Sequence, residues 1–93
     1  MLTYPISIQE RDTIEALYFE KNAKNNLLVL LSSRQDGYMN NDIFERVYNE
    51  AIQANVAFDS CFNTIMTKHV PKNLHYKDAR IEFISCELVI EEV

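Results

Sequence analysis

Gly37 is the only glycine among the 93 residues of this chain, and it separates two long segments without glycine or proline, residues 6–36 and 38–70. Glycine and proline interrupt regular backbone structure more often than other residues, so segments without them favour long helices. Asp36 and Gly37 supply turn chemistry, with Gly37 in the left-handed position just past a helix end. The sequence therefore predicts two helices joined by a turn at Gly37.

The first helix is expected to begin at Ser7. Ser7 and Glu10 have the spacing of a capping box, in which the Ser7 hydroxyl accepts from the Glu10 N–H and the Glu10 carboxylate accepts from the Ser7 N–H. The apolar run 27–31 alone would also fit a buried strand, but the helical pattern that precedes it favours a helix. Residues on one side of this helix share three-and-four spacing: Ile14, Leu17, Tyr18, Lys21, Leu28 and Leu31.

The second helix is expected to begin at Asp42, the best of several possible N-caps at 40–42, and to stop at Pro71. A helix of about 28 residues is about 42 Å long, which is more than a small globule needs. We therefore expect part of its surface to meet another molecule, and Ile52, Val56 and Met66 form a second apolar face for that contact. The main stripe is broken only by Asn55 and consists of Phe44, Val47, Tyr48, Ala51, Phe58, Phe62 and Ile65.

The sequence after Pro71 no longer has a helical pattern. Residues 72–78 are polar, and residues 80–90 have the composition of a single β-strand. Alternation would place Ile81, Phe83 and Val89 on one face, and the opposite face would carry Ile84, Cys86, Leu88 and Ile90.

A second candidate strand, residues 2–6, contains Pro5 and so belongs at an edge or an end of a sheet. Two strands are few, so they form a small ribbon on the helices, or a second chain completes the sheet. The expected fold class is α+β, mainly α: an antiparallel helical hairpin with a long second helix and a C-terminal strand. We expect one domain spanning residues 1–93.

Composition excludes several function classes. The net charge is −5, and the lysines and arginines are scattered, so nucleic-acid binding is not expected. The N-terminal residues lack the pattern of a signal peptide, and no apolar run is long enough for a membrane span. We therefore expect a cytoplasmic protein without a membrane contact.

The residues that could carry chemistry are few. Cys61, His69, His75 and Cys86 do not have the spacing of a structural zinc site, and no phosphate-binding motif occurs, so we expect no metal and no cofactor. Two cysteines do not make a disulfide framework. We interpret Cys61 as helix packing, Cys86 as a strand position, His69 as a residue at the carbonyl end of the second helix and His75 as a loop residue. No nucleophile with an orienting base is indicated, so we do not expect an enzyme.

Three segments together resemble a known family. They are residues 14–23 with Leu27 and Leu28 following, residues 42–47, and residues 80–88, which read IEALYFEKNA, DIFERV and RIEFISCEL. In this order they resemble the small accessory proteins of CXXX-repeat peptide modification systems. That family tends to carry tryptophans late in the second helix and at the start of the last strand, where this chain has none. The resemblance implies a non-enzymatic partner of a maturation enzyme or of its ribosomally made precursor peptide.

The leading functional prediction is an interaction protein that binds a peptide or an enzyme. It would use the strand as an edge for β-augmentation or the second apolar face of the long helix. The predicted partner-binding residues are Ile52, Val56, Met66, Glu82, Ile84, Cys86 and Leu88. The alternative is a structural or regulatory homodimer that buries the same helix and strand against its own copy.

Overall fold

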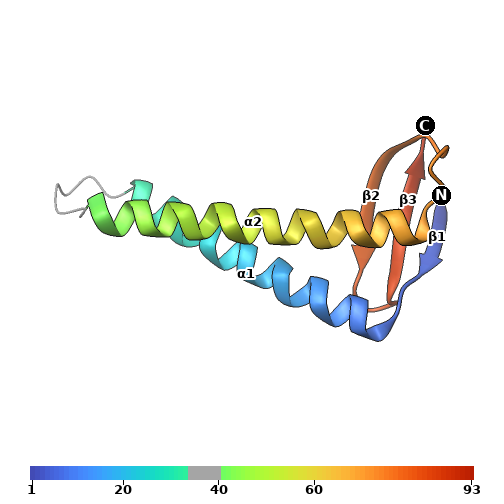
Figure 1. Cartoon of the computed structure of the whole chain (residues 1–93), viewed down its shortest axis with the longest axis horizontal. Helices are drawn as coiled ribbons and strands as arrows, with labels where there is room; N and C mark the ends of the chain where they lie inside the picture. The colour runs from blue at the N-terminus through green and yellow to red at the C-terminus, as the bar shows by residue number, and fades with distance from the viewer. Residues whose placement is uncertain (34–40) are drawn as a thin grey trace. The chain divides into compact units, whose positions relative to one another are not determined.

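The structure is a computed structural model of this chain, and it describes residues 1–33 and 41–93 (Figure 1). The predicted turn at Gly37 lies outside the described residues. The elements in chain order are β1 (Leu2–Pro5), α1 (Ile8–Ser33), α2 (Asn41–His69), β2 (Tyr76–Glu82) and β3 (Glu87–Glu92). Two long helices and a small antiparallel sheet confirm the predicted α+β, mainly α class.

The chain forms two compact units. The first, which we call the sheet unit, combines Met1–Glu15 with Cys61–Val93. The second, the helical unit, spans Ala16–Ser60. Each is described by itself, and the single domain expected for residues 1–93 stays a prediction.

The helix boundaries follow local chemistry. The Ser7 N–H donates to Glu10 Oε1 at 2.9 Å, and the Glu10 N–H donates to Ser7 Oγ at 3.0 Å, which confirms the predicted capping box. Helix α2 begins at Asn41, one residue before the expected cap, so Asp42 stands in its first turn. It ends at His69, because Pro71 lacks the N–H and the free φ angle that another helical turn would need.

The sheet has the strand order β1-β3-β2, and both pairs are antiparallel. Strand β1 pairs with β3 from Leu2 opposite Ile90 to Pro5 opposite Glu87. The N-terminal strand was predicted with Pro5 at an edge or an end, and it is both an edge strand and one that ends at Pro5.

The single strand predicted over residues 80–90 is wrong. The chain reverses at residues 83–86, so that β2 and β3 form a hairpin. Cys86, expected in a strand position, has a φ of 59° and belongs to this turn. The Ile6 N–H donates to the Cys86 carbonyl at 3.1 Å, and the Cys86 thiol donates back to the Ile6 carbonyl at 3.3 Å. The left-handed backbone at Cys86 thus directs the chain back along β2 and fastens the turn to the end of β1.

The reversal also changes which residues share a face. Ile81 lies opposite Leu88, and Ala79 lies opposite Ile90, so these residues share one face of the sheet. The predicted grouping of Ile81 with Val89 is therefore wrong. The polar segment 72–78, which precedes the predicted strand, already includes the start of β2 at Tyr76.

The core of the sheet unit lies on this face. Leu88 and Ile90 of the central strand are fully buried, as is Ile14 near the start of α1. Ile65 and Met66, near the end of α2, are also buried, and Figure 1 shows both helix ends beside the sheet. One face of the sheet and two helix ends therefore enclose the principal core.

This core predicts an unequal response to two alanine substitutions in the hairpin. Leu88→Ala removes a fully buried side chain from the central strand and should cost about 2 to 5 kcal/mol of the free energy of unfolding. Ile84→Ala changes a side chain in the turn that is fully exposed and should stay within about 0.5 kcal/mol of the original chain. Urea unfolding followed by circular dichroism measures both, and equal losses would contradict this placement of the core.

Candidate partner-binding surfaces

The structure separates the predicted partner-binding residues into two groups. Met66 is 9% exposed and Leu88 is fully buried, so these two are core residues of the sheet unit. Cys86 is half-buried in the turn. The residues with exposed side chains are Ile52, Val56, Glu82 and Ile84, and for these the binding role stays a prediction.

Helix α2 exposes an apolar stripe within the helical unit. Tyr48, Ile52 and Val56 follow each other at intervals of four residues, which places them along one side of a helix. Their exposed fractions are 47%, 45% and 60%. We call these three residues the α2 stripe. Tyr48 had been assigned to the inward face, and its exposure moves it to this outer one.

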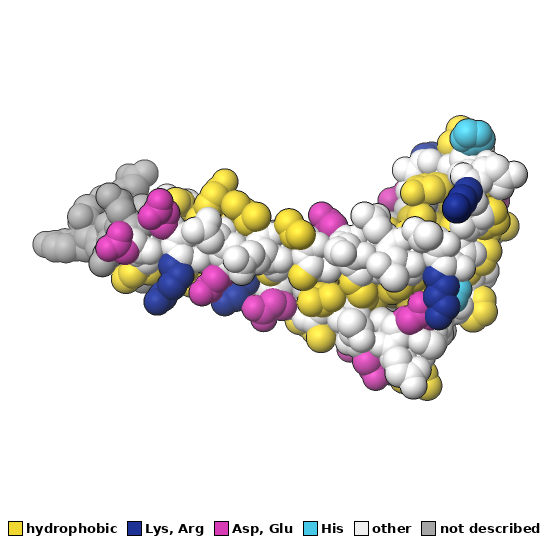
Figure 2. All heavy atoms as spheres, viewed as in Figure 1, with side chains coloured by type: hydrophobic (Ala, Val, Ile, Leu, Met, Phe, Trp, Pro, Cys, Tyr) yellow, Lys and Arg dark blue, Asp and Glu magenta, His cyan; other side chains and the backbone are white. Residues whose placement is uncertain are grey.

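Helix α1 carries a comparable stripe that the sequence analysis missed. Phe19, Ala23, Leu27 and Leu30 recur at intervals of four, four and three residues, and all are exposed, Phe19 to 62% and Leu30 to 63%. We call them the α1 stripe. The run 27–31 was predicted to belong to this helix without a second apolar side, although the spacing of Phe19, Ala23 and Leu27 already indicates one. Figure 2 shows hydrophobic side chains at the surface along the helical part of the chain.

The contact between the two helices is mostly polar. Lys24 Nζ donates to Glu50 Oε2 at 2.8 Å, and the hydrogen bond and the opposite charge raise the pKa of Lys24 and lower that of Glu50. Asn55, which breaks the apolar series of α2, donates to Asn25 Oδ1 at 2.9 Å. Its amide therefore has a partner on the facing helix.

Aromatic rings add contacts beside these polar pairs, and the ring centroids of Tyr18 and Phe58 lie 6.1 Å apart. The Lys21 ammonium lies 4.1 Å from the centroid of the Phe58 ring, a cation–π contact. Among the described residues of the helical unit, the buried hydrophobic side chains are Val47, Ala51 and Ala54, which are small. The buried apolar side chains of the helical unit are thus small, larger ones such as Leu17 and Phe58 are half-buried, and two apolar stripes are exposed.

The sheet unit has an open strand edge. Strand β3 lies between β1 and β2, so the part of the predicted edge formed by residues 87–90 is already paired on both sides. In the described sheet, β2 is hydrogen-bonded along one side, and its other side is an edge. The strand available for β-augmentation is therefore β2, whose charged residues are exposed, and not the segment that contains Leu88.

Glu10 is the centre of a polar cluster in the sheet unit. Besides its capping contacts, its carboxylate lies 3.1 Å from His69 Nε2 and 3.8 Å from Lys68 Nζ. Burial raises the pKa of Glu10, but the hydrogen bonds from Ser7 and His69 outweigh it, so this pKa lies below its ordinary value of 4.5. His69 therefore binds a carboxylate from α1, beyond its expected place at the end of α2.

Cys61 lies near this cluster without the features of a nucleophile. Burial, and to a lesser degree the charge of Glu10, raises the pKa of its thiol. A reactive cysteine needs the opposite shift, because the thiolate is the attacking form. Both cysteines are free thiols.

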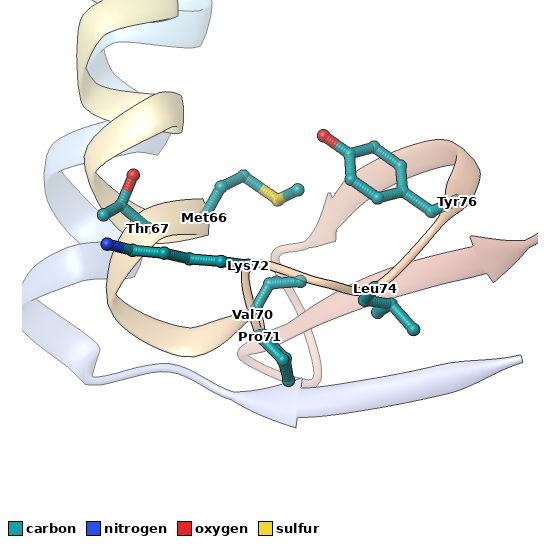
Figure 3. Close-up of a pocket in the computed structure, with 7 residues that line it drawn as sticks. All are labelled: Met66, Thr67, Val70, Pro71, Lys72, Leu74 and Tyr76. Carbon is teal, nitrogen blue, oxygen red and sulfur yellow. The ribbon is translucent and has the colours of Figure 1, made fainter.

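Two surface hollows in the sheet unit are small. One, of about 220 Å³, lies between the end of α2 and the start of β2 and is lined by Met66, Val70, Lys72 and Tyr76 among others (Figure 3). The other, of about 230 Å³, is lined by Glu10, Thr13 and Cys61 among others. Both are smaller than the roughly 300 to 1,000 Å³ of typical small-molecule sites. Each is of a size that suits a single side chain.

Residues 1–33 and 41–93 also bear on metal binding and on membrane insertion. There, no three side chains of His, Cys, Asp or Glu come together in a group that could hold a metal ion. Among the described helices, none combines the length and the apolar character that crossing a membrane requires.

Comparison with known proteins gives no match. No protein-family model, no curated protein and no solved structure matches this chain. The resemblance to peptide-modification accessory proteins therefore stays a prediction from the sequence.

The Glu10 cluster predicts a pH-dependent contribution to stability. Because the folded pKa of Glu10 lies below its unfolded value, its contribution is present above about pH 4.5 and is lost as the pH falls through the folded pKa. Glu10→Gln should cost about 1 kcal/mol at neutral pH and flatten the dependence of unfolding on pH in acid. Urea unfolding between about pH 3 and 7 measures this effect.

Glu15→Gln is the matched control, because it removes the same charge from the same helix away from His69. A larger loss of pH dependence in Glu15→Gln than in Glu10→Gln would contradict the role given to the cluster.

Proposed function

We propose that this chain is a non-catalytic interaction protein, an accessory subunit that binds a peptide-modifying enzyme or its peptide substrate. The observation that carries the proposal is the pair of exposed apolar stripes on the helical unit. A helix that packs against one neighbour needs one apolar face, and apolar residues on a second side indicate burial on that side too. Covering the stripes would gain about 25 cal/mol for each Å² of apolar area removed from water.

The form of the stripes suits a protein partner. Anchors spaced by three and four residues are how one helix packs along another or into a groove. Phe19 and Tyr48 are aromatic residues, which are enriched at the centres of protein interfaces. The polar inward contact between Lys24 and Glu50 involves no residue of either stripe.

A non-catalytic role agrees with the chemistry of the sheet unit. Burial keeps the Cys61 thiol protonated by raising its pKa, and the Glu10 carboxylate is occupied by Ser7, His69 and Lys68. The resemblance of residues 14–23, 42–47 and 80–88 to peptide-modification accessory proteins adds the class of partner. Such a partner, made and modified in the cytoplasm, places this protein there as well.

The second candidate function is a structural homodimer. It is favoured by the small inward core of the helical unit, because Val47, Ala51 and Ala54 alone bury little area. In that case the stripes would be covered by a second copy of this chain.

The test is light scattering on a sizing column, with the protein expressed alone and with the products of its neighbouring genes. For an accessory subunit, the mass should increase when the partner is present. A mass that is the same with and without those products would contradict the accessory role, and a dimer that depends on the stripes would support the structural homodimer.

Charge substitutions in the stripes identify the surface. Ile52→Glu combined with Val56→Glu should weaken the complex by about tenfold or more, because it places charges in a desolvated contact. Phe19→Glu tests the α1 stripe in the same way. Circular dichroism should still show full helicity, because all three side chains are exposed.

Asn49→Asp combined with Gln53→Glu is the matched control. It adds two negative charges to exposed positions of α2 without removing an apolar side chain. A partner complex that is weakened equally by the control and by the stripe variants would show a general charge effect and contradict an apolar interface.

A further inference from the structure

Strand β2 is an unusual edge because its exposed charges have a self-complementary order. Its solvent-facing residues are Asp78, Arg80 and Glu82, which lie opposite Glu91, Val89 and Glu87 of β3. Its core-facing residues include Ala79 and Ile81, which lie opposite the buried Ile90 and Leu88.

A second copy of β2 could pair with this edge only in certain registers. In an antiparallel pair related by a two-fold axis perpendicular to the sheet, the side chains of opposite residues point to the same face. The sequence numbers of two opposite residues therefore differ by an even number, and at the axis one residue lies opposite its own copy. An axis at Asp78 would place the Asp78 carboxylates of the two copies opposite each other. An axis at Arg80 would place the two Arg80 guanidinium groups opposite each other. Like charges directly opposite destabilise a strand pair.

The register with the axis at Ala79 avoids both conflicts. It places Asp78 of each copy opposite Arg80 of the other, which makes two cross-strand ion pairs within residues 78–80, on the C-terminal side of the irregularity in β2 between Tyr76 and Asp78. The residue on the axis is then an alanine, whose methyl group allows the two backbones to approach closely. An axis at Ile81 would also oppose unlike charges, but it would place the larger Ile81 side chain on the axis and would bring Ala79 opposite Phe83 of the turn at 83–86.

The charges concerned are available. The Asp78 carboxylate has no hydrogen bond and no ion pair with any of the described residues. Arg80 Nε donates to Glu82 Oε1 at 3.0 Å, with both side chains 48% exposed, and its guanidinium has further N–H donors. Arg80 can therefore keep Glu82 and accept a second carboxylate.

We propose that this chain forms a two-fold dimer through antiparallel pairing of β2 with β2, centred on Ala79, with Asp78 of each copy bound to Arg80 of the other. The resulting strand order is β1-β3-β2-β2-β3-β1. The outer edges are then the short β1 strands, which end at Pro5, so the sheet does not extend to further copies. The dimer leaves the α1 and α2 stripes uncommitted, and it is separate from the function proposed for them.

A charge exchange tests the register. The 10.9 kDa chain should be a dimer by light scattering, and Asp78→Arg or Arg80→Asp alone should weaken the dimer by about tenfold or more, because each places like charges opposite each other twice. The double variant Asp78→Arg with Arg80→Asp restores opposite charges and should return to within about threefold of the original affinity. A monomeric original chain, single variants that remain as dimeric, or a double variant without recovery would each overturn the proposal.

A cross-link tests the same register without altering the charges. On oxidation, Ala79→Cys should form a covalent dimer, because the two sulfurs meet at the axis at a separation that fits a disulfide. Ile81→Cys is the control, since it lies on the same face as Ala79 but two residues from the axis and so does not meet its own copy, and it should cross-link at least about tenfold less. Equal cross-linking of the two variants would overturn the register. Ile52→Glu with Val56→Glu should leave this dimer intact, so the dimer and the partner-binding function can fail separately.

Discussion

The pairing of β3 on both sides is the interaction on which the sheet unit depends. This strand lies between β1 and β2, and its Leu88 and Ile90 side chains are fully buried. Through it, the first residues of the chain and the hairpin at the other end share one sheet. The ends of α1 and α2 then cover the face that these side chains create. Removing β3 would therefore leave the short β1 without a partner and both helix ends without a surface to cover.

The helical unit differs from the sheet unit in how polar and apolar contacts are distributed. Its inward contacts include an ion pair and amide hydrogen bonds, Lys24 with Glu50 and Asn25 with Asn55, whereas several of its largest apolar side chains are outward. Directional contacts of this kind fix how two helices align, but their net contribution to stability is modest. Removing the apolar area of the stripes from water would contribute more free energy than these polar contacts, but only when another surface covers the stripes.

The sequence predicted those parts of the fold that local chemistry determines. The capping box at Ser7, the stop before Pro71 and the edge position of β1 each depend on a few adjacent residues. The hairpin was missed because its turn, Phe83-Ile84-Ser85-Cys86, contains none of the Gly, Pro, Asn or Asp residues that mark turns. A cysteine with left-handed backbone angles is uncommon, so the residue type of Cys86 did not indicate the chain reversal at residues 83–86.

The partner-binding residues were predicted less well for a related reason. Periodicity reveals which residues share a face, but not whether that face is covered. Met66 and Leu88 were therefore placed on a surface although the packing of helix ends on the sheet buries them. Phe19 was overlooked because α1 was assumed to have a single apolar side. Whether a helix face is buried or exposed depends on the tertiary packing around that helix, which periodicity alone does not reveal.

The pairing of Leu2 with Ile90 has a consequence for how the protein is made. Translation delivers β1 before α1, α2 and β2, so β1 has no strand to join until β3 emerges. The helical hairpin depends on nearer contacts and can form during that interval, while the sheet must close the longest loop in the chain. Until β3 is available, β1 exposes few unpaired backbone N–H and C=O groups to other strands, because it has four residues and ends in proline.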